Sequence, residues 1–123
     1  MSESTGSAYT LLMRGHAFLD EKRHHQAVVV LERARTLEPR KASIREALAR
    51  AYYAVQRFDE ARAEFEAALD IDPTNDYAHF GLALCLERCG RIDAARGHLK
   101  LACVMRPEDE NYQRALERIA PAS

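Results

Sequence analysis

The sequence contains no tryptophan, and it has only three cysteines, four prolines and five glycines among its 123 residues. So few glycines and prolines exclude a loop-rich or disordered chain. An odd number of cysteines favours a reducing compartment over a disulfide framework, and we therefore expect a cytoplasmic protein. No apolar run approaches the roughly 18 residues of a membrane-spanning helix, and the polar first seven residues do not resemble a signal peptide, so no membrane partner is expected.

An excess of one charge is also missing, because 18 Lys and Arg residues face 19 Asp and Glu residues for a formal net charge of −1. The basic residues are scattered and matched by acids, which argues against a nucleic-acid partner. Charge is nevertheless uneven along the chain, since residues 8–41 carry a net charge of +3 and residues 42–75 a net charge of −3. We interpret this distribution as a solvated surface of mixed charge.

What the sequence does contain is an internal repeat. Three of its four prolines, Pro39, Pro73 and Pro107, lie 34 residues apart, and a fixed period of that size indicates a repeat architecture. Small residues that let helices approach closely, and bulky apolar residues that fill the space beside them, keep the same register. Places are counted in units of 34 from Ala8. The small residues are Gly15, Ala49 and Ala83 at place 8, Ala27, Ala61 and Ala95 at place 20, and Ala34, Ala68 and Ala102 at place 27. The bulky residues are Phe18, Tyr52 and Leu86 at place 11, and Leu31, Phe65 and Leu99 at place 24.

This pattern closely resembles the tetratricopeptide repeat family over 102 of the 123 residues. The resemblance implies an all-α fold, a right-handed superhelical α-solenoid of three helix-turn-helix repeats with a C-terminal capping helix. The implied repeats are residues 8–41, 42–75 and 76–109, and the capping helix covers 109–120, so that the repeat domain spans 8–120. Residues 1–7 and 121–123 are expected to be disordered tails.

Each repeat is predicted to consist of a helix A, a short turn and a helix B that proline ends. The predicted A helices are 9–21, 43–55 and 77–89, and the predicted B helices are 25–38, 59–72 and 93–106. We expect Asp59 and Asp93 to cap two of the B helices. In the capping helix, Tyr112, Leu116 and Ile119 form an apolar stripe, opposite a polar face of Glu110, Arg114, Glu117 and Arg118.

Motifs of known catalytic chemistry are absent from the sequence. There is no glycine-rich phosphate loop, no G-x-S-x-G turn and no H-E-x-x-H helix. Cys85 and Cys89 share a helix face, but no second pair accompanies them, so we interpret the cysteines as packing residues. No carboxylate occupies a place where burial is expected. The sequence therefore predicts a protein that is not an enzyme and that holds no metal and no cofactor.

The helix-A face opposite helix B lines the concave groove in this family. In this chain that face carries more apolar surface than a solvated helix should, which is typical of a protein-binding surface. We therefore predict a non-catalytic scaffold, adaptor or chaperone-like, that binds a partner peptide or helix. The predicted groove residues are Tyr9, Leu12, Met13, His16, Glu46, Arg50, Tyr53, Tyr77, Phe80, Leu84 and Arg88.

One ligand known for the family is not expected. Some of its members bind the acidic C-terminal tail of heat-shock chaperones through a clamp of lysine, asparagine and arginine at five groove places. In this chain those places hold Leu12, His16, Ala47, Tyr77 and Gly81, and none matches. The more apolar groove resembles those of three-repeat secretion chaperones of the same family.

An alternative function is self-assembly through the N-terminal repeat. Val29 and Val30 occupy places that usually face outward, and no helix is expected before Tyr9 to cover that end of the stack. The sequence therefore also allows a structural module that forms homodimers or larger homo-oligomers. We expect charge substitutions at the two valines to dissociate them.

Overall fold

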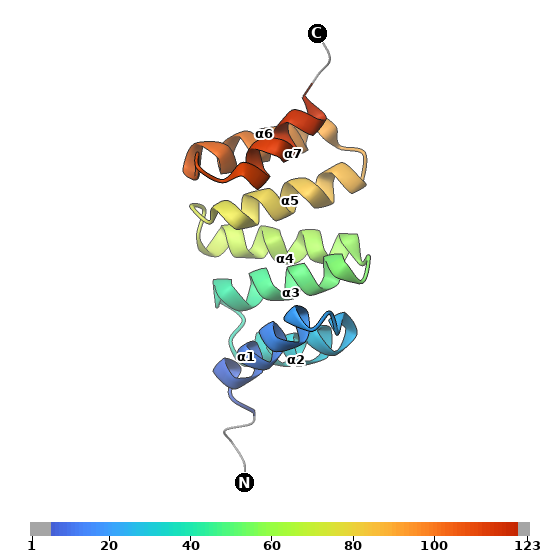
Figure 1. Cartoon of the computed structure of the whole chain (residues 1–123). Helices are drawn as coiled ribbons and strands as arrows, with labels where there is room; N and C mark the ends of the chain where they lie inside the picture. Colours follow the sequence, from blue (N-terminus) through green and yellow to red (C-terminus); the bar gives the residue numbers. More distant parts are fainter. Residues whose placement is uncertain (1–5, 121–123) are drawn as a thin grey trace.

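The computed structural model describes residues 6–120 and is built of α-helices joined by short turns (Figure 1). Residues 1–5 and 121–123, which belong to the predicted tails, lie outside the described residues. The helices are α1 (Ala8–Asp20), α2 (His24–Leu37), α3 (Ala42–Ala54), α4 (Phe58–Ile71), α5 (Asp76–Arg88), α6 (Ile92–Met105) and α7 (Glu110–Ile119).

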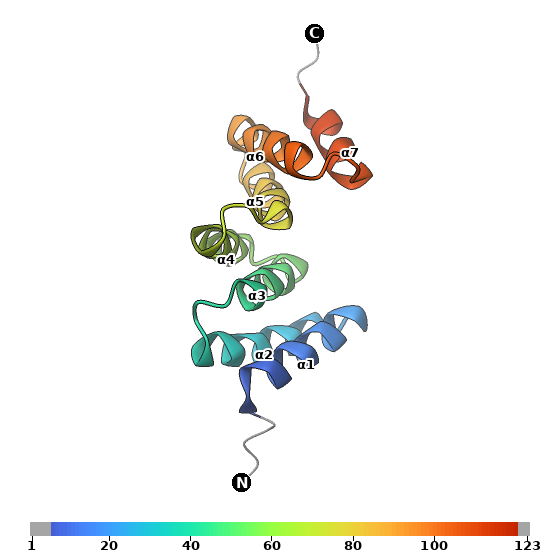
Figure 2. The ribbon, with the colours of Figure 1, turned by 90° about the vertical axis from the view of Figure 1, so that its left-hand side faces the viewer.

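The helices stack in chain order between the two termini (Figures 1 and 2), and each packs on the helix before it and the helix after it. The pairs α1–α2, α3–α4 and α5–α6 are three helix-turn-helix repeats, and α7 covers α6. Helix α3 also touches α1 and α5, so the three A helices form one continuous layer. This arrangement confirms the predicted α-solenoid with a capping helix.

The A and B helices begin and end one residue earlier than predicted. Asp59 and Asp93 are not N-caps, because Arg57 and Arg91 hold those positions without a side-chain hydrogen bond to the helix. Both aspartates instead lie in the first turn, where a negative charge still interacts favourably with the helix dipole. Ser7, which the sequence assigned to a tail, caps α1 by accepting a hydrogen bond from the Thr10 amide at 3.1 Å.

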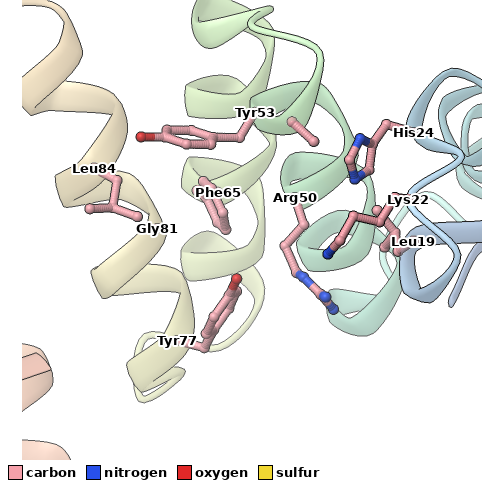
Figure 3. Close-up of a pocket in the computed structure, with 10 residues that line it drawn as sticks. Leu19, Lys22, His24, Arg50, Tyr53, Phe65, Tyr77, Gly81 and Leu84 are labelled. Carbon is pink, nitrogen blue, oxygen red and sulfur yellow. The ribbon is translucent and has the colours of Figure 1, made fainter. Parts of the chain in front are cut away.

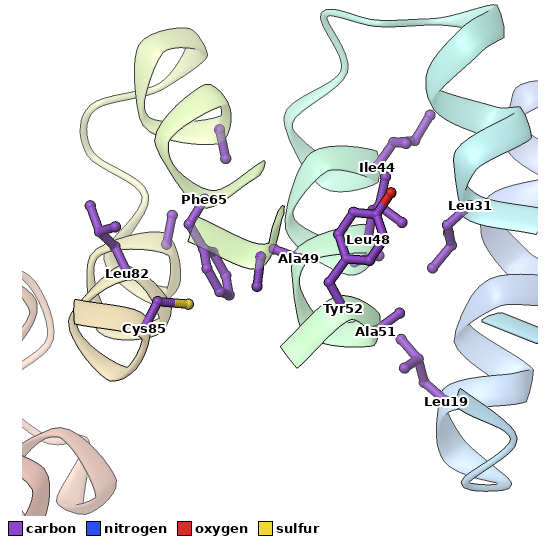
Figure 4. Close-up of a cluster of buried hydrophobic side chains, with 14 of the residues drawn as sticks. Leu19, Leu31, Ile44, Leu48, Ala49, Ala51, Tyr52, Phe65, Leu82 and Cys85 are labelled. Atoms are coloured by element: carbon purple, nitrogen blue, oxygen red, sulfur yellow. The ribbon is translucent and has the colours of Figure 1, made fainter. Parts of the chain in front are cut away.

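The main core alternates small and large side chains through the stack (Figure 4), and a second, smaller cluster of Ala102, Cys103 and Tyr112 lies between α6 and α7. Ala27, Ala49 and Ala61 are fully buried, Leu31 packs against Gly15, and Phe65 packs against Gly81. Burying a leucine or phenylalanine side chain contributes about 1.5–3 kcal/mol, so the repeated places stabilise each interface between neighbouring helices.

The turn between helix A and helix B has the same backbone in all three repeats. Lys22, Gln56 and Gly90, which lie 34 residues apart, have φ angles of 60°, 66° and 81°. Only glycine adopts this left-handed conformation freely, and other residues pay about 1–2 kcal/mol. The turn reverses the chain direction, so that helix B packs along helix A. In repeat one, this turn places Lys22 beside the C-terminal end of α1.

Helix α7 is attached to the last repeat by both apolar and polar contacts. Tyr112 and Ile119 are buried as predicted, while Ala115 is buried more fully than Leu116. The Tyr112 hydroxyl donates a 2.6 Å hydrogen bond to Oδ2 of Asp76 on α5. Burial and this carboxylate raise the pKa of Tyr112. Asp109 caps α7 through hydrogen bonds from two backbone amides of its first turn.

One carboxylate is buried, which the sequence analysis did not expect. Glu64 on α4 is 6% exposed and accepts a 2.8 Å hydrogen bond from Nη1 of Arg45 on α3 and a second from Nη1 of Arg35 on α2. Partial burial acts to lower the pKa of Arg35, but the charge and hydrogen bond of Glu64 raise it. The expectation was wrong because two arginines from preceding helices converge on this place and compensate the burial of its charge.

Candidate binding groove

A continuous groove runs along the A-helix layer from the first turn to α7. It consists of three adjoining hollows of about 240, 750 and 420 Å³, and Leu84 lines all of them. Tyr77 is shared by the first two hollows and Tyr53 by the first and third. These hollows lie over α3, α5 and α7.

The hollow of about 240 Å³, which we call the central hollow, has an aromatic floor. Phe65 reaches it from α4, because Gly81 on α5 leaves room for the ring: a Cβ atom at Gly81 would lie 2.1 Å from Phe65 Cζ. Tyr77 lies beside it, with ring centroids 6.2 Å apart (Figure 3). Burial raises the pKa of Tyr77, so its hydroxyl stays neutral at physiological pH.

Two arginines lie over aromatic rings of the groove. The Arg88 guanidinium is 5.8 Å from the Tyr53 ring and donates a 3.2 Å hydrogen bond to the Tyr53 hydroxyl. The Arg50 guanidinium is 6.0 Å from the Tyr77 ring. Among residues 6–120, no carboxylate lies within ion-pair distance of either guanidinium, so both remain free to bind a partner.

The carboxylate whose charge acts on Arg50 is Glu46, one turn earlier on α3. Burial raises the pKa of Glu46, while a hydrogen bond with Asn75 and the positive charge of Arg50 act to lower it. Glu46 thus contacts Asn75, the N-cap residue of α5, and it does not line the hollows described above.

The largest hollow lies between α5 and α7. Phe80 and Tyr112 form its apolar wall with ring centroids 4.9 Å apart. Arg114, Glu117 and Arg118 line its edge, so this side of the predicted polar face of α7 borders the groove. Arg118 forms an ion pair with Glu87 of α5.

Of the eleven predicted groove residues, six line these hollows: Arg50, Tyr53, Tyr77, Phe80, Leu84 and Arg88. Tyr9 and Met13 are exposed on α1, and His16 is half-buried there, but none of them lines a described hollow. Leu12 is 7% exposed, so its expected place on the open surface was wrong. The contact between α1 and α3 explains this difference, because it covers the strip of α1 that faces the next A helix.

Besides the residues of α7, some groove residues come from places that the sequence analysis did not assign to the groove. Lys22 and His24 reach the central hollow from the turn and first residue of α2, and Phe65 reaches it from a B helix. A helical wheel of the A helices alone cannot find them. The sequence signal for Phe65 was Gly81. A glycine at a groove place of α5 leaves a gap through which a side chain of α4 can reach the groove.

A separate hollow of about 220 Å³ lies at the N-terminal end of the stack. Phe18 and Val29 line it together with Arg14, Gln26 and Val30. Val29 is 58% exposed, but Val30 is only 5% exposed, so the expectation of an outward Val30 was wrong. Adjacent helical residues point about 100° apart, and here the second valine turns into the core.

Two histidines form a pair between α5 and α6. Nδ1 of His79 lies 3.0 Å from Nδ1 of His98, and Nε2 of His79 lies 3.0 Å from the Pro73 carbonyl oxygen. A carbonyl only accepts, so Nε2 of His79 donates to Pro73, and the two Nδ1 atoms share one proton between the rings. Burial and the neighbouring His79 lower the pKa of His98.

Within residues 6–120, no three His, Cys, Asp or Glu side chains gather closely enough to hold a metal ion. Cys85 and Cys103 are buried, and Cys89 is exposed. Burial raises the pKa of Cys85 to about 12, which leaves its thiol protonated and unreactive at neutral pH. No helix of the described part of the chain is long and apolar enough to cross a membrane.

Comparison with known sequences identifies the repeat. Two sequence models of the tetratricopeptide repeat match the chain, over residues 12–76 and 54–119, and each spans more than half of it. The chain is also similar to "Protein bimA" of Emericella nidulans, with 25% identity over 95 residues, or 77% of this chain. It corresponds to only 12% of the length of that protein.

Solved structures share the fold at low sequence identity. The first TPR of Spaghetti (RPAP3) bound to HSP90 peptide SRMEEVD has a TM-score of 0.88 and 14% identity, with 92% of this chain and 90% of that chain covered. The Yersinia enterocolitica type III secretion chaperone SycD in complex with a peptide of the translocator YopD has a TM-score of 0.79 and 17% identity, with 98% and 89% covered. At identities this low, the structural similarity establishes a common fold alone.

Proposed function

This chain belongs to the tetratricopeptide repeat family, and on that premise we propose that it is a non-catalytic interaction scaffold that binds a peptide or helix of a protein partner in its concave groove. Its role is that of an adaptor or chaperone-like module. We further propose that it acts in the cytoplasm, where its three free cysteines stay reduced.

The observation that carries the proposal is the combination of aromatic walls and free arginines in one groove. Tyr53, Tyr77, Phe80 and Leu84 are half-buried and leave apolar surface open along the groove. Arg50 lies among them without an ion-pair partner in the described part of the chain. Aromatic side chains and arginine dominate the binding energy of protein interfaces, and here they are preformed on rigid helices.

The structural neighbours support a peptide ligand. The Spaghetti TPR domain is bound to an HSP90 peptide, and SycD is bound to a peptide of YopD. Both share the stacked-helix layer over most of this chain.

We propose that the acidic heat-shock tail is not that partner. At the five clamp places, Leu12, Ala47 and Gly81 are buried, and none of the five carries a permanently charged side chain. The peptide SRMEEVD should therefore bind no more tightly than about 1 mM. Amidation of its C-terminus should leave that affinity unchanged, as measured by isothermal titration calorimetry. Micromolar binding that amidation abolishes would contradict this exclusion.

The groove assignment is tested by comparing partner capture among single variants. Leu84→Glu places a carboxylate at the residue shared by all three hollows, and Arg50→Glu reverses the free charge. Both should abolish capture of the partners that the wild-type chain retains, as measured by affinity purification and quantitative mass spectrometry. The matched control is Leu101→Glu, at a 45% exposed position on α6 that lines none of these hollows.

Circular dichroism establishes that each variant is folded before capture is compared. Partners that are lost with Leu84→Glu and retained with Leu101→Glu support the groove. If all variants capture the same partners as the wild type, the groove is not the binding surface.

Self-assembly is a second candidate function, and the N-terminal hollow favours it. Val29 and Phe18 present apolar surface there, and within residues 6–120 no helix covers that end of the stack. Exposed apolar ends of repeat stacks associate with other surfaces.

A further inference from the structure

We propose that the groove contains an anion subsite formed by Lys22, His24 and Arg50, and that it selects partner segments with an acidic residue beside a large apolar one. This inference rests on the proposed function and names the chemistry of its ligand. The occupant is an internal Asp or Glu side chain of the bound segment.

Three basic side chains converge on the central hollow from two directions. Lys22 and His24 come from the turn and first residue of α2, and Arg50 comes from α3. Figure 3 shows the Lys22 and Arg50 side chains approaching each other at the edge of the hollow, with His24 beside them. Like charges that converge on one space create a positive potential, which an anion would relieve.

Among the described residues, no carboxylate lines this hollow. Its remaining lining residues are neutral, and neither Lys22 nor Arg50 forms an ion pair with any residue of 6–120. Elsewhere the chain pairs its arginines freely, as at Arg57–Glu60 and Arg114–Glu110. Glu46, one turn before Arg50, acts on Arg50 by its charge but does not line the hollow, so the hollow itself has no negative group to complement Lys22 and Arg50.

An apolar cavity adjoins these three basic side chains. Leu19, Phe65 and Leu84 line the same hollow of about 240 Å³, which is large enough for one leucine-sized or aromatic side chain. A segment in the groove that inserts such a side chain brings its neighbouring residues to the Lys22–Arg50 edge. The geometry therefore couples an apolar residue and an acidic residue that lie one or two positions apart.

The subsite differs from the heat-shock clamp described above. Lys22 lies in the turn between α1 and α2 and His24 is the first residue of α2, whereas all clamp places lie on A helices. It needs no free C-terminal carboxylate. Binding through it should therefore be the same for internal and terminal segments.

The test is selection from a phage-displayed library of random 12-residue peptides on the immobilised full chain. The wild type should enrich peptides with Asp or Glu within two positions of Leu, Met, Phe, Tyr or Trp. The double variant Lys22→Glu, Arg50→Glu should lose this bias and enrich Lys or Arg at the same spacing. The matched control is Lys100→Glu, at an exposed lysine of α6 remote from the groove, which should select as the wild type does.

One enriched peptide and its Glu→Gln version then give the size of the effect. By fluorescence polarisation at low salt, the neutral version should bind the wild type about fivefold more weakly, as expected for one partly exposed ion pair. The difference should disappear at 1 M NaCl, where the Debye length is about 3 Å.

The outcomes separate the two proposals. If the wild type enriches nothing, or enriches peptides that Leu84→Glu also retains, the groove function itself is wrong. If it enriches groove-dependent peptides without an acidic bias, or with a bias that survives the double charge reversal, the anion subsite is wrong and the groove function stands.

Discussion

Phe65 on α4 occupies the space that a side chain at Gly81 on α5 would fill. A Cβ atom at Gly81 would lie 2.1 Å from Cζ of the ring and 2.4 Å from Cε1, well inside contact distance. The ring is 2% exposed and forms the floor of the central hollow. The packing of repeat two against repeat three and the shape of the groove therefore depend on the same pair of residues.

The substitution Gly81→Ala should destabilise the protein by about 1–2 kcal/mol. Displacing the Phe65 ring costs about 1–3 kcal/mol, and the better helix propensity of alanine offsets at most about 1 kcal/mol of that. Urea unfolding followed by circular dichroism measures the change. The control is Gly97→Ala on α6, where the added Cβ meets nothing within 4 Å and only the propensity gain remains. Equal stabilisation by both substitutions would show that the ring moves without cost.

The substitution Glu64→Gln should destabilise the protein by about 2 kcal/mol. It removes the negative charge that compensates Arg35 and Arg45, whose side chains are only 30% and 22% exposed. Glu66→Gln is the control, because Glu66 is exposed and forms only an i,i+4 pair with Arg62, worth less than about 0.5 kcal/mol. Chemical denaturation of both variants gives the comparison. A loss at Glu64 no larger than that at Glu66 would contradict the structural role of this carboxylate.

The stability of the protein should fall as the pH falls below about 6.5, and His98 should contribute to that loss. Burial and His79 lower the pKa of His98 in the folded chain, although the charge of Glu66 opposes them. The unfolded chain therefore binds a proton at a higher pH than the folded chain does, and folding becomes less favourable, by up to about 1.4 kcal/mol per pH unit. Unfolding free energies measured between pH 7.5 and 5.5 should depend less on pH in His98→Gln. The exposed His25 provides a control, and if His25→Gln flattens the curve as much, the effect does not come from the histidine pair.

If the N-terminal end self-associates, Val29→Glu should convert the oligomer into a monomer. Val29 is 58% exposed in the hollow that it shares with Phe18, so a carboxylate there opposes apolar contact without entering the core. Val104→Glu, at a 77% exposed valine of α6, is the control at the other end of the stack. Light scattering at high micromolar concentration measures the mass. A monomeric wild type, or an oligomer that Val29→Glu leaves intact, would exclude assembly through this end.

The fold followed from the sequence because its information is periodic. Pro39, Pro73 and Pro107 mark the repeat length, and the small and bulky residues between them mark which helix faces meet. Only the helix ends were displaced, by one residue. Arg57 and Arg91 hold the N-cap positions there because the left-handed turn residue before each of them sets where the helix can begin.

The groove was predictable only in part. Arg50, Tyr53, Tyr77, Phe80, Leu84 and Arg88 were found because the 100° rotation per residue assigns each helix face independently of its neighbours. Leu12 was misplaced because its exposure depends on how closely α1 approaches α3. Phe65 was missed because it lines the groove only through the gap at Gly81.

The sequence by itself determined the repeat architecture, the helix faces and the lack of catalytic motifs, since these follow from local periodicity and residue type. Only the tertiary structure decided which charges are compensated. It pairs Glu64 with two arginines of other helices, and it brings Lys22, His24 and Arg50 into one hollow that no carboxylate of residues 6–120 lines. These relationships join residues between 19 and 29 positions apart, and the angle at which successive helices pack sets them. That angle depends on the whole interface and not on any one residue.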